Sequence, residues 1–281
     1  NAFAGTQPTI AEGPITRNVA DAALVMTALQ GYDGRDPYSL TDTVDFMGAL
    51  DRPIEGLRIA YSPDFDTYPI DPRVAANVAA SVRAFEEAGA VVEEVKIGHG
   101  IDQLELAHLW CRMIMPLNIA GLEGLKAFGL DLMATDDLPP VYKHWVEATR
   151  GATLADLQRD DVMRSQVFDA MQGVLADYDL LVTPTLSTLP PVNTDDGDTM
   201  GPREVNGVEI DPSIGFCLTF PTNFTGHPSA SIPAGLADGL PVGMQLIGRL
   251  KDDATVIAAS AAFERVRPWQ DTYAIPRDRA L

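Results

Sequence analysis

A histidine and a cysteine stand three residues apart in the middle of the chain, at His108 and Cys111. On a helix they would share a face, and the imidazole could then act as the base for a thiolate nucleophile. The neighbours Trp110, Met113 and Met115 are apolar, however. Such surroundings are more typical of packing than of catalysis. We therefore interpret the pair as a packed thiol beside a histidine whose hydrogen bonds are satisfied.

The other groups that could do chemistry are weaker candidates. Asp252 and Asp253 resemble a carboxylate pair, but they precede an apolar helical pattern, where negative charge at a helix start is favourable. The segment GDTMGPREVNG lacks the spacing of a phosphate-binding loop. No two histidines have the spacing of metal ligands; they are His99, His108, His144 and His227. We expect neither a metal nor a cofactor.

Composition limits the class of protein. Of the 281 residues, 46% are hydrophobic and 21% charged, which is typical of one large globular domain or two smaller ones. The chain has 20 Lys and Arg against 40 Asp and Glu, a net charge of −20. This charge argues against nucleic acid and anionic membranes as partners, and no apolar run reaches the ~18 residues that span a membrane. Two cysteines provide no disulfide framework, which favours a cytoplasmic location.

Strand and helix patterns alternate along the chain. Strands are predicted at residues 57–63, 90–95, 179–185 and 229–233, and a turn followed by a strand is predicted within 239–249. Helices are predicted at 18–30, 72–88, 102–150, 153–178 and 252–266. Residues 57–95 have the pattern of a strand, a helix of about 17 residues and a second strand, which is typical of a parallel crossover. We therefore predict an α/β fold with a mixed sheet covered by helices.

Local signals refine these elements. Thr16 or Asn18 is predicted to cap the first helix, and Thr153 to cap the helix at 153–178. Pro116 and Gly121 predict breaks or kinks within 102–150. The polar, acidic stretch 194–207 is predicted to be an exposed loop.

Five segments together resemble the amidase signature enzymes. GPITRNVADAALVM, DLLVTPT, FPTNFTGHPSASIPAG, GLPVGMQLIGR and DDATVIAASAAFERVRPW occur in the family's order, between Gly13 and Trp269. The resemblance implies that residues 1–281 are the C-terminal portion of a single amidase signature domain, with a helical insert at about 102–176. The expected fold is the family's mixed sheet covered by helices, lacking its N-terminal part.

The resemblance also implies a mechanism. Family members hydrolyse amides with a Ser-Ser-Lys triad, because a hydroxyl attacks a carbonyl only when a base takes its proton. This chain has no Gly-Gly-Ser-Ser run, and its nine serines and four lysines match no catalytic motif of the family. We therefore assign it no catalytic residue and expect it to be inactive alone. The triad is expected before residue 1, so the N-terminal segment of the same enzyme is a predicted partner.

The part that this chain can contribute is a wall of the substrate pocket. In amidotransferase A subunits of the family, an acidic residue five positions before the proline of a P-x-N element binds the amino group of glutamine. Here that position is Phe216, counted from Pro221. Fatty acid amide hydrolases have apolar acyl-channel residues at the positions that correspond to Phe216 and Phe220. We predict that these two residues line the pocket with Cys111 and Met115; core packing is the alternative.

The expected substrate is a small or medium-sized, uncharged amide. A pocket-side cysteine and an apolar lining resemble the 6-aminohexanoate-cyclic-dimer hydrolases of the family, which open a cyclic amide. Two alternatives stay open: an A-type subunit of a glutamyl-tRNA amidotransferase, and a non-catalytic scaffold relative. A homodimer is also left open.

Overall fold

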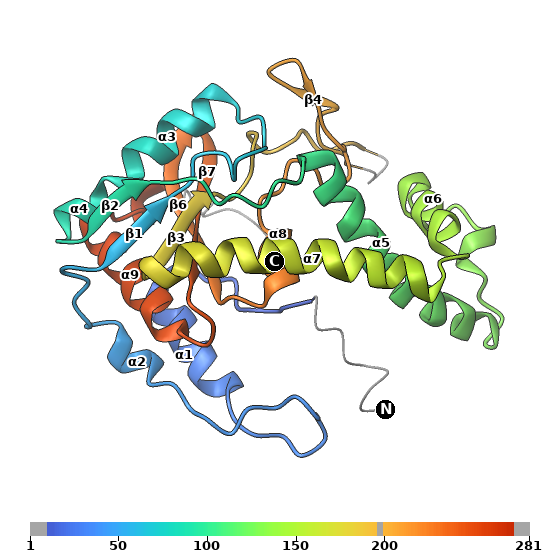
Figure 1. Cartoon of the computed structure of the whole chain (residues 1–281), viewed down its shortest axis with the longest axis horizontal. Helices are drawn as coiled ribbons and strands as arrows, with labels where there is room; N and C mark the ends of the chain where they lie inside the picture. Colours follow the sequence, from blue (N-terminus) through green and yellow to red (C-terminus); the bar gives the residue numbers. More distant parts are fainter. Residues whose placement is uncertain (1–9, 196–198, 273–281) are drawn as a thin grey trace, which may run out of the picture.

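The computed structural model describes residues 10–195 and 199–272, and its centre is a five-stranded sheet. The strands are β1 (Arg58–Tyr61), β2 (Val91–Glu94), β3 (Leu180–Pro184), β6 (Ser229–Ala237) and β7 (Leu240–Gly248). Their order is β2-β1-β3-β7-β6, as Figure 1 shows. β1 runs parallel to β2 and β3, whereas β7 runs antiparallel to β3 and β6. The predicted mixed sheet is confirmed.

The predicted crossover between β1 and β2 is also confirmed, with one correction. Asp71 caps α3 (Pro72–Val82) by accepting the Arg73 N–H, and Pro72 occupies the first turn. The predicted single helix is interrupted at Arg83, after which α4 (Ala84–Glu87) completes the connection. Gly89 then reverses the chain with a φ of +93°, which glycine adopts readily.

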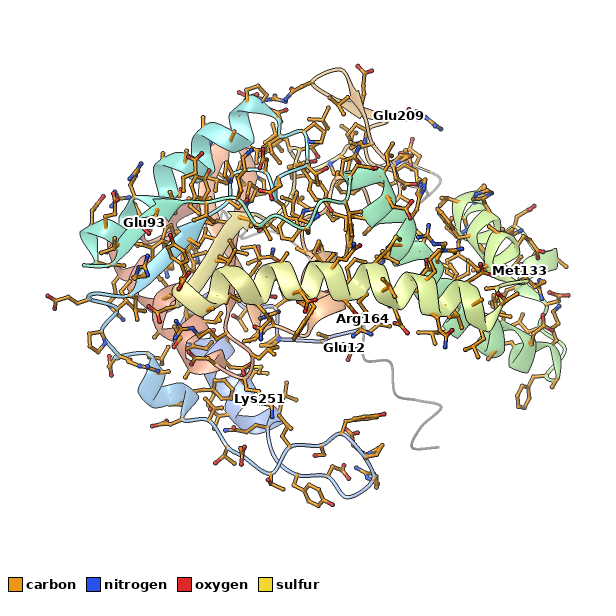
Figure 2. The ribbon with its side chains drawn as sticks, in the orientation of Figure 1. Glu12, Glu93, Met133, Arg164, Glu209 and Lys251 are labelled. Carbon is orange, nitrogen blue, oxygen red and sulfur yellow. The ribbon has the colours of Figure 1, made fainter. Side chains whose placement is uncertain are left out.

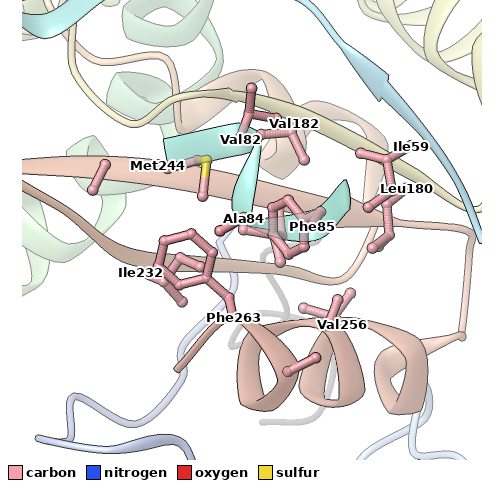
Figure 3. Packing of buried hydrophobic residues seen from close by; sticks show 14 of the residues in the cluster. Ile59, Val82, Ala84, Phe85, Leu180, Val182, Ile232, Met244, Val256 and Phe263 are labelled. Atoms are coloured by element: carbon pink, nitrogen blue, oxygen red, sulfur yellow. The ribbon is translucent and has the colours of Figure 1, made fainter. Parts of the chain in front are cut away.

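Helices on one face of the sheet enclose the larger core, shown in Figure 3. They are α1 (Val19–Leu29), α2 (Phe46–Ala49), α3, α4 and α9 (Asp253–Val266). Phe85 and Phe263 meet at a centroid distance of 5.4 Å between α4 and α9. Asn18 caps α1, as one of the two predictions had it, and Glu264 accepts the Val19 N–H at 2.9 Å.

The opposite face is covered by α5 (Gln103–Lys126), α7 (Leu154–Asp177) and α8 (Phe220–Thr225). Ala60, Leu181 and Ile247 face these helices, while their strand neighbours face the larger core. Thr153 caps α7 in a capping box, as predicted. The helical arm, comprising α5, η1 (Leu132–Ala134), α6 (Pro140–Thr149) and α7, extends beyond the sheet (Figure 1). The arm comprises nearly the same residues as the insert predicted at about 102–176.

Two further predictions are corrected. α5 continues through Pro116 and Gly121, so of the predicted breaks or kinks the breaks are not formed. The loop predicted at 194–207 lies partly outside the described residues, and its last part forms β4 (Glu204–Val205), which pairs with β5 (Val208–Glu209). Val205 is buried, so this part of the stretch is not simply exposed.

Candidate functional site

The wall segment, residues 214–220, carries two of the predicted pocket residues and crosses the end of β3. The Phe216 carbonyl accepts the Ser187 N–H at 2.8 Å, and the Leu218 N–H donates to the Thr185 carbonyl at 3.0 Å. Residues 212–219 form turns and a bridge before α8 begins at Phe220. The segment therefore forms neither a regular strand nor a regular helix before α8. Backbone contacts with the residues after β3 fix the segment's position.

Gln245 of β7 holds the wall segment by a hydrogen bond from the sheet. It lies on β7 opposite Thr183 of β3, and the register places both side chains on the same face of the sheet. Its Nε2 donates to the Leu218 carbonyl at 3.1 Å and to Thr183 Oγ1 at 3.2 Å. Gln245 is only 2% exposed, so it satisfies a carbonyl that water does not reach.

A tight turn centred on Asp211 leads into the wall segment. The Asp211 carboxylate accepts the Ser213 N–H at 2.8 Å and the Ser213 hydroxyl. The Asp211 carbonyl accepts the Gly215 N–H at 2.8 Å. A side chain on Gly215 would meet the backbone of Asp211 at 2.6 Å, so the turn requires glycine. His108 of α5 approaches the same carboxylate, with Nε2 at 3.6 Å from Oδ2.

Cys111 lies against this turn, and its environment decides between the two interpretations of the His108–Cys111 pair. Burial raises the pKa of the Cys111 thiol to about 12, and the nearby Asp211 charge acts in the same direction. The thiol is therefore protonated at neutral pH and is a poor nucleophile. The burial of Cys111 agrees with the packed-cysteine interpretation, and its place in the pocket wall stays a prediction. His108, however, is 41% exposed and pairs with Asp211.

The structure places the two wall phenylalanines in different surroundings. Phe220 is 3% exposed and packs against Trp110 of α5, with 5.9 Å between ring centroids, and against Phe224. Phe216 is half-buried and belongs to neither core cluster of the described residues. Met115, one turn beyond Cys111 on α5, is also half-buried and outside these clusters. Phe216 and Met115 therefore remain candidates for contact with a ligand, whereas Phe220 contributes to the core.

Arg164 of α7 joins the helical arm to α8 (Figure 2). Its Nε donates to the Phe224 carbonyl at 2.5 Å, near the C-terminal end of α8. Gly226 ends that helix with a φ of +72°. His227 follows, buried between Thr225 Oγ1 at 2.8 Å and Gln172 Oε1 at 2.9 Å. The C-terminal end of α8, the helix that follows the wall segment, is thus held against α7.

The remaining features of the described chain lie away from this site. A cavity of about 430 Å³ lies beside α2 and α9, on the other face of the sheet, lined by Asp45, Gly48, Ala49, Asp51, Arg52 and Ala254. Asp252 caps α9 by accepting the Thr255 N–H, which confirms its interpretation as helix-start charge. Within residues 10–195 and 199–272, no three His, Cys, Asp or Glu side chains are grouped to hold a metal ion.

A search of the described helices for a membrane-spanning segment finds none that combines sufficient length with sufficient apolar character.

Sequence reasoning missed three residues that shape the site. Gln245 has a local signal, because it is a polar residue facing inward in an apolar strand. Arg164 has none, since it is one of several charged residues along α7. Gly201 also has none. A Cβ atom there would lie closer than 3.0 Å to the Phe216 ring. Gly201 and Phe216 belong to different segments, so no local sequence pattern indicates this contact.

Comparison with known proteins gives consistent matches in sequence. A model of the Amidase family matches residues 6–257. An acylamidase from Rhodococcus erythropolis is 32% identical over 262 residues, which are 92% of this chain and 53% of that protein. The A-type subunit of a glutamyl-tRNA(Gln) amidotransferase from Latilactobacillus sakei is 30% identical over 271 residues, 90% of this chain and 54% of that protein. The chain spans about half the length of the curated relatives it matches.

Solved structures agree. A bacterial aryl acylamidase of the amidase signature enzymes superposes with a TM-score of 0.92 at 44% identity, over 96% of this chain and 55% of that one. A 6-aminohexanoate cyclic dimer hydrolase, solved with its substrate, gives a TM-score of 0.74 at 19% identity, over 91% and 55%. At that lower identity the likeness concerns the fold alone.

Proposed function

The chain belongs to the amidase signature family, and we propose that it forms the acyl-binding part of an amide hydrolase. The reaction is acyl transfer to water. A Ser-Ser-Lys triad supplied by further residues of the same enzyme, expected before residue 1, makes the nucleophile. The partner of this chain is then the N-terminal segment of that enzyme.

The polar contacts of this chain support a nucleophile from elsewhere. In the described residues, no lysine Nζ hydrogen-bonds a serine hydroxyl. Lys143 donates to the Thr135 carbonyl, and Lys126 pairs with Glu123. Cys111 is buried and Cys217 is partly buried, and burial raises the pKa values of their thiols to about 12 and about 11. The family's nucleophile needs a lysine base within hydrogen-bond reach of a serine, and neither Lys126 nor Lys143 contacts a serine.

The substrate that the wall supports is an uncharged amide of small or medium size. The observation that carries this proposal is the apolar Phe216 on a fixed wall segment, at the position where the resemblance to the amidotransferases calls for a carboxylate. A buried ammonium group without a partner is costly. The likeness to an aryl acylamidase at 44% identity favours an N-acyl aryl amide. A cyclic amide is the other uncharged candidate.

A second candidate is the A-type component of a glutamyl-tRNA amidotransferase, because one such protein is 30% identical to this chain. Phe216 and the net charge of −20 count against it. A non-catalytic relative that keeps only the scaffold is a third candidate.

The test is a hydrolysis assay with 4-nitroacetanilide, using the 281-residue chain and the complete enzyme side by side. We expect the complete enzyme to release 4-nitroaniline and the chain alone to be inactive. L-glutamine serves as the competing substrate. Hydrolysis of glutamine but not of the anilide would favour the amidotransferase assignment. Activity of the chain alone would refute the proposed division of the site.

A further inference from the structure

The ring of Phe216 occupies the space in which a Cβ atom on Gly201 would lie. A Cβ atom on Gly201 would be closer than 3.0 Å to both Cδ1 and Cε1 of that ring. Real Cβ atoms do not approach other atoms so closely. The φ angle of Gly201 lies outside the left-handed region, so the space beneath the ring, and not the backbone conformation, requires glycine here.

The backbone on both sides of this contact is fixed. The Gly201 N–H donates to the Pro212 carbonyl at 2.8 Å, and the Ile210 N–H donates to the Arg203 carbonyl at 3.0 Å. The β4–β5 pairing continues this ladder. Gln103 of α5 holds the hairpin by donating Nε2 to the Glu209 carbonyl at 2.8 Å (Figure 2 labels Glu209). Gly201 therefore cannot retreat easily from the ring.

The ring also has little freedom on its own backbone. The Phe216 carbonyl accepts a hydrogen bond from the Ser187 N–H. In the preceding turn, the Asp211 carboxylate accepts the Ser213 N–H. The Gly215 N–H donates to the Asp211 carbonyl at 2.8 Å, which holds the residue before Phe216 in the turn. A side chain at position 201 must therefore turn the ring itself. Phe216 is half-buried, so part of its surface is uncovered, and a Cβ atom at position 201 would push the ring away from Gly201.

We propose that Gly201 is a specificity-determining residue that sets the depth of the acyl pocket through the position of the Phe216 ring. This inference rests on the proposed function. Gly201 itself has no side chain to touch the substrate, so it acts through Phe216 as a positioning residue. A side chain at 201 moves the ring into the pocket and shortens the acyl group that the enzyme accepts.

The experiment compares four forms of the complete enzyme: wild type, Gly201→Ala, Phe216→Ala and the double variant. The substrates are the acetyl, butyryl and hexanoyl amides of 4-nitroaniline. We expect Gly201→Ala to lower the hexanoyl-to-acetyl ratio of kcat/KM about five- to tenfold, because a long acyl group needs the space that the ring then fills. In the Phe216→Ala background, the same substitution should leave the ratio unchanged. Gly173→Ala on α7 is the matched control, since a Cβ there meets no atom within 4 Å.

Thermal melting of the same four proteins provides a second readout if Gly201→Ala folds poorly. The loss of Tm caused by Gly201→Ala should largely disappear when Phe216 is alanine, because the clash is then removed. An equal loss of Tm in both backgrounds would overturn the contact. An unchanged acyl ratio in a folded Gly201→Ala enzyme would overturn the specificity role. If the wild-type enzyme hydrolyses none of the three anilides, the proposed preference for N-acyl aryl amides is wrong and the inference fails with it.

Discussion

Arg112 of α5 and Asp160 of α7 form a buried ion pair, with Nε at 3.1 Å from both carboxylate oxygens. Asp160 is 2% exposed. Arg112 also binds Glu105 at 2.7 Å, and Arg159 approaches Asp160 at 3.6 Å. The two long helices of the arm are thus joined through one desolvated carboxylate, which depends on its partners for compensation of its charge.

Replacing Arg112 with alanine should destabilise the protein by about 2–3 kcal/mol. The substitution leaves Asp160 buried with only the more distant Arg159 beside it. Urea unfolding of the complete enzyme measures the change. Arg83→Ala is the control: its pair with Glu86 is exposed, and its loss should cost less than about 1 kcal/mol. Equal effects of the two variants would show that the arm does not depend on the Arg112–Asp160 pair.

Both cysteines should resist alkylation in the folded protein. Burial raises the pKa of Cys111 to about 12 and that of Cys217 to about 11, so almost no thiolate is present at pH 7.5. Iodoacetamide should modify neither residue within minutes in buffer and both in urea, as mass spectrometry can count. Rapid modification of Cys111 in the native protein would revive the nucleophile interpretation.

His227 should make the protein less stable as the pH falls from about 6.5 to about 4. Burial lowers the pKa of His227 to about 4, whereas in the unfolded chain it has the ordinary value near 6.5. In this window the unfolded chain binds a proton that the folded protein does not, so protonation favours unfolding. His227→Gln should flatten the dependence of Tm on pH between 7 and 5. The exposed His144, changed to Gln, should keep the wild-type slope.

The sequence predicts the features that local chemistry determines. Thr153, Asp252 and Asn18, the last as one of two candidates, are predictable as helix-start residues because a cap depends on only three or four neighbours. The five strands of the sheet were recognised because their apolar runs are short and bounded by turn residues. β6, however, extends to Ala237, beyond the predicted end at Pro233.

Features that depend on tertiary packing were not predictable in the same way. Pro116 cannot donate to the carbonyl four residues earlier, yet α5 continues because α6 and α7 pack along it. The candidate site shows the same limit. Gly201 leaves the space that the Phe216 ring occupies. No hydrophobic period or motif spacing in the sequence relates these two positions. The different surroundings of Phe216 and Phe220 likewise follow from the turn between them and α5.

Replacing Phe216 with aspartate should change which amides the complete enzyme prefers. An apolar ring offers no partner to an ammonium group, and an unpaired buried ammonium costs several kcal/mol, whereas a carboxylate would pair with it. Phe216→Asp should therefore slow the turnover of neutral amides and improve that of amides with an α-amino group. The measurement is kcat/KM for two amides that differ only in that amino group. Phe128→Asp is the control, because Phe128 is 88% exposed on the helical arm. If the ratio for Phe216→Asp moves by less than about threefold, roughly 0.65 kcal/mol of transition-state selectivity, Phe216 is a packing residue and not part of the pocket.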